Sequence, residues 1–131
     1  MCVFCKIIDG SIPSKKVYED DDVLAILDIS QATVGHTLVM PKKHYANILE
    51  IPADTYTKVM LKAKEIAEKL DKKLKPKGIN ILNNWGEVAG QTVMHYHVHI
   101  LPRYNDEELK IEFTDHSSVV NLDDILNEIN D

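Results

Sequence analysis

The sequence predicts an α+β fold, in which an antiparallel sheet of about five strands carries one long helix across a face. Two observations indicate this class. Short runs rich in β-branched residues alternate with turn residues, which is typical of antiparallel strands. A single long stretch, from about Ala53 to Leu74, has the apolar spacing of an amphipathic helix.

The N-terminal segment predicts a short helix followed by a hairpin. Residues 3–9 form a helical turn that we expect to end at Gly10, since glycine readily adopts the backbone conformation that follows a helix. Two β-rich runs, 16–19 and 23–27, are separated by three consecutive aspartates. This arrangement predicts two antiparallel strands joined by a turn.

Three further strands are expected along the chain. The first covers residues 37–40 and stops at Pro41, because proline cannot donate a backbone hydrogen bond to the sheet. The second covers 79–83. The third covers 95–101 and is expected to stop at Pro102. The sum is a sheet of about five strands.

The long helix has eight apolar residues spaced by three and four, which places them on one face. They are Tyr56, Val59, Met60, Ala63, Ile66, Ala67, Leu70 and Leu74. Asp54 is the expected N-cap, and Pro76 with Gly78 ends the helix. Two acid–lysine pairs spaced by four residues are expected to stabilise its outer surface. They are Glu65/Lys69 and Glu68/Lys72.

Length and composition predict one domain over residues 1–131, with the tail 105–131 the least defined part. The tail ends in an apolar spacing, from Leu122 to Ile129, that predicts a short amphipathic helix. A net charge of −6 argues against a general nucleic-acid binder. No run resembles a membrane span or a signal peptide, so a cytoplasmic protein is expected.

Three histidines alternate in the run His95-Tyr96-His97-Val98-His99. In a strand, alternate residues point to one face, so the three imidazoles would form a row. Two chemistries suit such a row. Alternating histidines can bind zinc, or a neutral middle imidazole can act as a nucleophile beside anion donors. The neutral donors just upstream favour the second chemistry, and they are Asn84, Gln91 and Thr92.

Residues 90–103 resemble the signature of the histidine-triad (HIT) superfamily, in which three histidines alternate with apolar residues. The resemblance continues in segments typical of its nucleotide-binding Hint branch. These are Phe4-Cys5-Lys6-Ile7-Ile8-Asp9-Gly10, Ile12-Pro13, Tyr18-Glu19-Asp20, Leu27-Asp28-Ile29-Ser30 and Gly35-His36-Thr37-Leu38-Val39-Met40-Pro41-Lys42-Lys43-His44. The likeness covers residues 2 to about 104.

The resemblance implies an enzyme that binds a purine nucleotide and cleaves its α-phosphate bond. His97 would be the nucleophile that forms a nucleotidyl-histidine, and His99 would donate to the phosphate oxygens. His95 would orient His97 through its backbone carbonyl, and His36 would support the triad from behind. Thr92 would protonate the leaving group. The remaining nucleotide-binding residues would be Asp28 at the ribose, Asn84 and Gln91 at the phosphate and leaving group, Val3, Phe4, Ile7, Ile26 and Ile29 around the base, and Val93.

The resemblance also implies a homodimer in which two five-stranded sheets become one. Some bacterial members place a Cys-x-x-Cys beside two histidines, and the matching residues here are Cys2, Cys5, His44 and His95. Two thiolates and two imidazoles suit a closed, structural zinc site, one per chain. A thioredoxin-like redox pair is disfavoured, since no βαβ unit follows.

Four functions remain open from the sequence. The leading one is hydrolysis or nucleotidyl transfer on nucleoside 5′-phosphoramidates or adenylates. The second is hydrolysis of dinucleoside polyphosphates, because Gly90-Gln91-Thr92-Val93 also resembles the fragile-histidine branch. The third is a nucleotide-binding regulatory or scaffold protein. The fourth is a zinc hydrolase that uses all three histidines as ligands.

Overall fold

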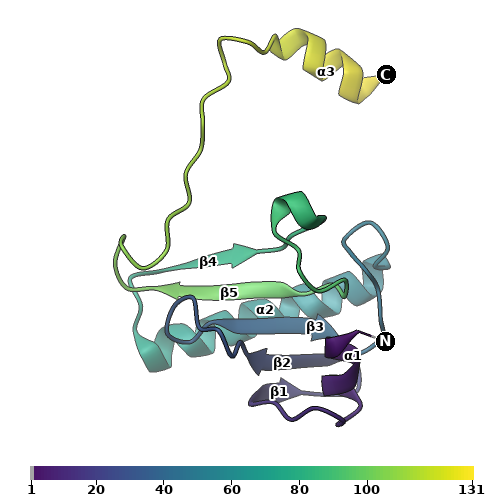
Figure 1. Ribbon diagram of the computed structural model, residues 1–131, viewed down its shortest axis with the longest axis vertical. Helices are drawn as coiled ribbons and strands as arrows, with labels where there is room; N and C mark the ends of the chain where they lie inside the picture. Colours follow the sequence, from purple (N-terminus) through teal and green to yellow (C-terminus); the bar gives the residue numbers. More distant parts are fainter. Residues whose placement is uncertain (1) are drawn as a thin grey trace.

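A computed structural model describes residues 2–131, and Figure 1 shows its elements. In chain order these are α1 (Val3–Ile8), β1 (Lys16–Glu19), β2 (Val23–Leu27), β3 (Thr37–Pro41), α2 (Ala53–Leu74), β4 (Gly78–Leu82), the 3-10 turn η1 (Glu87–Ala89), β5 (Val98–Arg103) and α3 (Leu122–Asn130). The five strands form one sheet in the order β1-β2-β3-β5-β4, and every neighbouring pair is antiparallel. The predicted α+β class is confirmed.

The sheet has a different apolar layer on each face. Helix α2 covers one face, where Val59, Ala63, Ile66 and Leu70 are buried against the sheet. Helix α1 covers the other face through Phe4, which packs on Leu24, Ile26, Leu38 and Met40. Because side chains alternate along a strand, Val98 and Ile100 of β5 join the α2 layer. The alternate residue His99 therefore lies on the α1 face, where the histidine run faces the N-terminal helix.

Two prolines belong to strands that were expected to stop before them. Pro41 is the last residue of β3 and pairs with Val23, while Pro102 of β5 pairs with Ile79. Strand β3 pairs with β5 only through residues 98–100 of β5, so each proline has a sheet neighbour on one side only. The missing N–H can then face the unpaired side, which is where a sheet tolerates proline.

Strand β5 also begins later than expected. The predicted strand covered 95–101, whereas pairing starts at Val98 and continues to Arg103. His95 and His97 therefore lie in irregular backbone before the strand. The predicted alternation nevertheless continues through them: Tyr96, Val98 and Ile100 join the core under α2, whereas the rings of His95 and His97 pack against Phe4 and the ring of His97 lies beside that of His99.

Helix α2 has the predicted bounds, but its ends and surface pairs differ from expectation. Pro52 is the N-cap and provides no side-chain hydrogen bond, while Asp54 lies in the first turn. The helix ends at Leu74, before Lys75 in the left-handed conformation. Glu65 and Glu68 pair with lysines that precede them in the sequence, and not with Lys69 and Lys72, which follow them. The ion pairs are Lys62–Glu65 and Lys64–Glu68.

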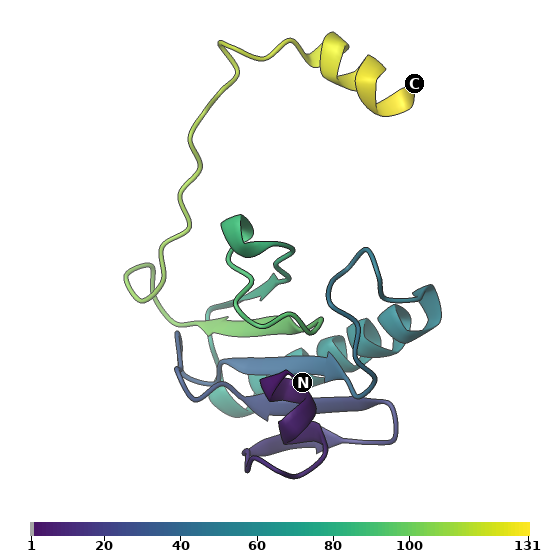
Figure 2. The same cartoon turned by 45° about the vertical axis from the view of Figure 1, so that its right-hand side comes forward.

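The C-terminal tail leaves the body beyond β5. Arg103 holds the loop at residues 104–109, since its Nη2 donates to the carbonyl of Leu109 over 2.6 Å and its Nε pairs with Glu108. From residue 110 onward every side chain is exposed, and α3 stands away from the sheet (Figures 1 and 2). The predicted tail helix is present. Within residues 2–131, no helix has the length and apolar character needed to cross a bilayer.

Candidate active site and metal centre

A pocket of about 410 Å³ opens on the α1 face, beside the histidine run. Its apolar wall contains all of the residues expected around a base and one further residue expected to bind the nucleotide. They are Val3, Phe4, Ile7, Ile26, Ile29 and Val93. Its polar wall is formed by Asp28, Thr92, His97 and His99. Elements from both ends of the chain therefore meet around one cavity.

His97 is held so that one ring nitrogen is available for reaction. Its Nδ1 lies 2.7 Å from the carbonyl oxygen of His95. Because a carbonyl only accepts, Nδ1 must carry the proton, and Nε2 keeps its lone pair. Burial lowers the pKa of His97 below its usual 6.5, so the ring is neutral at neutral pH. A neutral imidazole with a bare nitrogen can attack phosphorus.

Phe4 and Asn83 fix the position of His97. The phenyl ring of Phe4 packs edge-on against the imidazole, with centroids 4.9 Å apart. The carboxamide of Asn83, just after β4, donates to the carbonyl oxygen of His97 over 3.0 Å. The nucleophile candidate is thus held through its ring and through its backbone.

A chain of hydrogen bonds determines which ring nitrogen of His99 carries the proton. The backbone N–H of Ala32 donates to Nδ1 of His36 over 3.2 Å. Burial lowers the pKa of His36, so the neutral ring carries its proton on Nε2. That nitrogen lies 2.9 Å from Nδ1 of His99 and donates to it. His99 must then carry its own proton on Nε2, which makes it a hydrogen-bond donor beside His97 in the pocket wall.

Asp28 lies at the other end of this chain. Its Oδ2 is 3.6 Å from Nε2 of His36, and its Oδ1 accepts from the backbone N–H of Ser30 over 2.8 Å. The carboxylate also borders the pocket. It can accept hydrogen bonds from a ligand while holding the loop after β2 in place.

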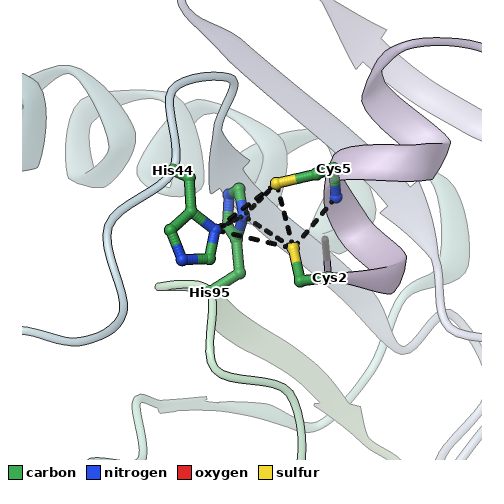
Figure 3. A group of neighbouring side chains, drawn as sticks. All are labelled: Cys2, Cys5, His44 and His95. Carbon is green, nitrogen blue, oxygen red and sulfur yellow. Dashed lines mark hydrogen bonds between the residues drawn. The ribbon is translucent and has the colours of Figure 1, made fainter.

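Four metal-ligating side chains converge next to the pocket, as Figure 3 shows. Cys2 and Cys5 come from the start of α1, His44 from the loop after β3, and His95 from the segment before β5. Both cysteines are free thiols whose sulfur atoms lie 3.0 Å apart. The Nδ1 atoms of His44 and His95 are 3.2 Å apart, and the sulfur-to-nitrogen distances run from 3.4 to 3.6 Å.

Zinc–sulfur and zinc–nitrogen bonds place the ligand atoms of a tetrahedron about 3.3 to 3.8 Å apart. The four sulfur-to-nitrogen distances lie in this range, whereas the two sulfur atoms, 3.0 Å apart, and the two nitrogen atoms, 3.2 Å apart, are closer together than zinc ligands would be. His95 is also oriented as a ligand, because its Nε2 lies 2.8 Å from the carbonyl oxygen of Pro41. That carbonyl requires the proton on Nε2 and leaves the lone pair of Nδ1 directed at the thiols. The donor set and its support therefore suit zinc.

The three histidines of the run do not converge on one point. Nδ1 of His95 faces the cysteines, Nδ1 of His97 faces a carbonyl, and Nδ1 of His99 faces His36. Each ring has its own partner, so they do not make a three-histidine metal site in the described chain. The fourth function considered from the sequence, a zinc hydrolase with these three ligands, is wrong for this reason.

Of the two carboxamides expected at the phosphate, one is paired within the protein and the other lies outside the pocket lining. Gln91 is 2% exposed, and its Nε2 donates to the carbonyls of Ala46 and Val93 while its Oε1 accepts from Gly86. Its donors are consumed, so the expected role for Gln91 at the phosphate is wrong. Asn84 lies outside the pocket lining, with its carboxamide against Gly90.

The family profile described as "HIT domain" matches residues 9–106 of this chain. The chain belongs to the HIT family. An uncharacterised HIT-like protein of Methanocaldococcus jannaschii is 50% identical to this HIT protein over 129 residues, which are 98% of each chain. A crystal structure of a HIT family member from Bacillus subtilis has a TM-score of 0.91 at 45% identity, and the match covers 98% of this chain and 92% of that chain.

Other relatives of this HIT protein have names that state a chemistry. An adenylylsulfatase of Arabidopsis thaliana is 42% identical, over 78% of this chain and 52% of that protein. A zinc-bound histidine-triad protein of Mycobacterium smegmatis has a TM-score of 0.79 at 40% identity, covering 85% of this chain and 81% of that one. A histidine-triad nucleotide-binding protein of Candida albicans has a TM-score of 0.84 at 33% identity, covering 99% and 93%.

Three supporting groups in this HIT protein were not identified from the sequence. Two are backbone groups, the N–H of Ala32 and the carbonyl of Pro41, and every residue type offers such groups. The third is Asn83, whose neighbour Asn84 was chosen instead. The predicted strand extended one residue beyond Leu82 and so included Asn83, which left Asn84 as the loop residue that was considered.

Stability of this HIT protein should fall as the pH drops below about 6.5. Burial, together with the nearby His97 and His36, lowers the pKa of His99 from 6.5 to about 4. Between these two pH values the imidazole is protonated in the unfolded chain but neutral in the folded chain. The contribution of His99 to the free energy of unfolding is therefore fully present above pH 6.5 and is lost as the pH falls toward 4. The contribution of His99 is roughly 3 kcal/mol at most.

Urea unfolding at several pH values between 7.5 and 4.5 measures this loss. A His99→Gln variant should show a shallower decline than the parent protein. His116→Gln is the matched control, since His116 is exposed in the tail, and its decline should equal that of the parent. Equal slopes for all three proteins would show that the buried imidazole does not drive the acid sensitivity.

Proposed function

We propose that this protein hydrolyses or transfers the nucleotidyl group of nucleoside 5′-phosphoramidates or adenylates, through a nucleotidyl-histidine on His97. The observation that carries the proposal is the contact between Nδ1 of His97 and the carbonyl of His95, which leaves Nε2 unprotonated at the pocket. The names of two relatives, an adenylylsulfatase and a nucleotide-binding protein, support the same class of ligand.

In the first step, the lone pair on Nε2 of His97 attacks the α-phosphorus and forms a phosphorus–nitrogen bond. The bond from phosphorus to the leaving group breaks, and the leaving group takes the electron pair. Thr92, in the pocket wall, provides the hydroxyl proton for an amine leaving group. In the second step water attacks the same phosphorus and gives a proton to the Thr92 oxygen, which restores its hydroxyl. His97 leaves as a neutral imidazole, and the nucleoside monophosphate is released.

The other pocket residues hold the nucleotide for these steps. The Nε2–H of His99 donates to a non-bridging phosphate oxygen, where negative charge develops in the transition state. Asp28 accepts hydrogen bonds from the ribose hydroxyls, and Val93 flanks the phosphate. The base lies in the apolar slot, which includes Phe4, Ile7, Ile26 and Ile29. The phosphate and ribose are thus assigned to the polar wall of the cavity, and the base is assigned to its apolar wall.

Turnover of adenosine 5′-phosphoramidate, adenylyl sulfate and diadenosine polyphosphates, compared at equal enzyme concentration, tests the proposal. A higher kcat/KM for the first two is expected. Preference for diadenosine polyphosphates would favour the alternative reaction on dinucleoside polyphosphates. Tight nucleotide binding without turnover of any of them would contradict the enzyme and favour a regulatory or scaffold protein.

The proposal includes one structural zinc per chain at Cys2, Cys5, His44 and His95. All four ligand positions are occupied by protein, so the site has no open position for substrate or water. Zinc there would tie the start of α1 to the segment that carries His97. Since α1 also supplies part of the apolar slot, the metal would hold the two walls of the pocket together.

The proposal also includes a homodimer that joins two sheets edge to edge through β4. The two outer strands differ in character. β1 is protected by a bulge and by the charged residues Lys16 and Glu19, which are features that discourage pairing. β4 has no such protection, and Ile81 on it is 44% exposed.

An Ile81→Lys variant should raise the dimer dissociation constant by about tenfold or more, because two lysines would face each other near the symmetry axis. Sedimentation equilibrium measures the constant. Leu49→Lys, at a loop position that is 75% exposed, is the charge-matched control and should dimerise like the parent. A parent that sediments as one chain at micromolar concentration would overturn the dimer.

A further inference from the structure

The metal-ligating cluster reaches the surface of the protein on one side. His95 is 0% exposed and forms the buried side of the cluster. His44 is exposed, and Cys2 and Cys5 are half-buried free thiols. Figure 3 shows the two sulfur atoms side by side, facing the two imidazoles. A small solute can therefore reach the sulfur atoms without any opening of the core.

The two sulfur atoms are placed to react with each other. They lie 3.0 Å apart, which is closer than two ligands of one zinc ion would be. The backbone N–H of Cys5 donates to the sulfur of Cys2 over 3.1 Å and directs that sulfur across the first turn of α1. Cα atoms three residues apart at a helix start are about 5 to 6 Å apart, a separation that suits a disulfide. Rotation of the two side chains is enough to bring the sulfur atoms into bonding distance.

The chemistry of the pair depends on its oxidation state. Cys2 and Cys5 are the only cysteines in the sequence, so oxidation within one chain can produce only the disulfide between them. Zinc binds cysteine as the thiolate, which is also the form that reacts with oxidants. A disulfide carries no charge on either sulfur. After oxidation, His44 and His95 would be the only remaining ligands, which are too few to retain the ion.

We propose that Cys2 and Cys5 are a redox-sensitive modification site, at which a hydroperoxide converts the two thiolates to a disulfide and thereby releases zinc. The inference rests on the zinc site proposed above and does not depend on the reaction at His97. It differs from a thioredoxin-like activity, because the pair is oxidised by a small molecule and passes no electrons to another protein.

The oxidation proceeds in two steps. In the first, one thiolate attacks an oxygen of hydrogen peroxide, the oxygen–oxygen bond breaks, and a sulfenic acid and hydroxide are formed. In the second, the neighbouring thiolate attacks the sulfenic sulfur, the sulfur–sulfur bond forms, and a second hydroxide leaves. Each hydroxide takes up one proton and becomes water. The two sulfur atoms together lose two electrons, which the peroxide gains.

Release of zinc should separate α1 from the segment that carries His95. α1 then keeps its apolar contacts through Phe4 but loses the tie to His44 and His95. The melting temperature of the oxidised protein should be lower by about 5 °C or more, because a closed metal site contributes its binding energy to folding. The disulfide closes a loop of only a few residues and recovers only part of this loss. The oxidation state of the pair would thus determine how stably the protein is folded.

Treatment of the zinc-loaded, full-length protein with hydrogen peroxide tests the proposal. A chromogenic chelator measures released zinc, alkylation counts free thiols, and denaturing mass spectrometry identifies the product. One zinc should be released for every two thiols lost, and the chain mass should fall by two hydrogen atoms. Dithiothreitol followed by zinc should restore the thiols, the metal and the melting temperature of the parent.

A Met94→Leu variant is the matched control. Met94 adjoins the ligand His95 and is 44% exposed, and peroxide also oxidises methionine. The variant should release zinc at the rate of the parent. Release that disappears in this variant would overturn the proposal, because the methionine would then be the reactive group.

Three further outcomes would overturn the proposal. The first is zinc that stays bound at peroxide concentrations that oxidise Met94. The second is release accompanied by added oxygen on the cysteines in place of a disulfide. The third is parent protein that contains no zinc after purification, which would remove both the metal site and its redox sensitivity. Turnover of adenosine 5′-phosphoramidate by the same preparation tests the role of His97 separately.

Discussion

Replacement of His97 by asparagine should reduce turnover on the order of 10³-fold or more, because the chemical step then has no nucleophile. Asparagine is smaller than histidine and leaves the pocket open, so binding of adenosine monophosphate should persist. Steady-state kinetics with adenosine 5′-phosphoramidate measures the first quantity, and calorimetric titration measures the second. Rapid quenching with labelled substrate should trap one nucleotide per chain on the parent protein and none on the variant.

A His116→Asn variant is the control for this experiment. His116 is an exposed histidine in the C-terminal tail, and its replacement should leave turnover at the parent level. Turnover by the His97 variant within a few-fold of the parent would contradict covalent catalysis at that residue. Loss of turnover together with loss of nucleotide binding would indicate that the pocket has collapsed. Circular dichroism would then show whether the variant keeps the secondary structure of the parent.

Removal of the two thiols should abolish zinc binding and lower the melting temperature by about 10 °C, since a closed metal site contributes its binding energy to folding. The variant is Cys2→Ser/Cys5→Ser, and elemental analysis with thermal melting measures both effects. The same shift should appear in the parent protein after chelation, and it should reverse when zinc is restored. Turnover measured below the melting temperature should remain within a few-fold of the parent.

Two results would reject this account of the metal. Freshly purified protein without any bound metal would rule out a resident zinc site. Chelation that abolishes turnover but leaves the melting temperature unchanged would make the metal catalytic, and the role of His97 as nucleophile would have to be reconsidered. A His44→Gln variant separates the cases further. It removes a ligand that contacts His95 but does not line the pocket, so it should lower stability without a matching loss of turnover.

The sequence by itself determined the elements whose cause is local. The hairpin at residues 16–27 follows from its two β-rich runs and the aspartates between them, and the structure shows Asp20 accepting from the N–H of Val23 in that turn. Helix α2 has the predicted bounds because its apolar spacing is decided within each turn of helix. The histidine run and the Cys-x-x-Cys also identified the family, which the comparison with known proteins confirms.

The tertiary structure alone decided how the histidines are used. The proton on Nε2 of His95 is set by the carbonyl of Pro41, 54 residues away in the chain, and the proton on His99 by His36, 63 residues away. The burial of Gln91 depends on a carbonyl 45 residues distant. Local sequence preferences extend over a few residues. These contacts, in contrast, exist only once β3 has paired with β5 and α1 has packed on the sheet. Residue types therefore indicated which groups could react, and the packing of the sheet determined which nitrogen of each ring is available.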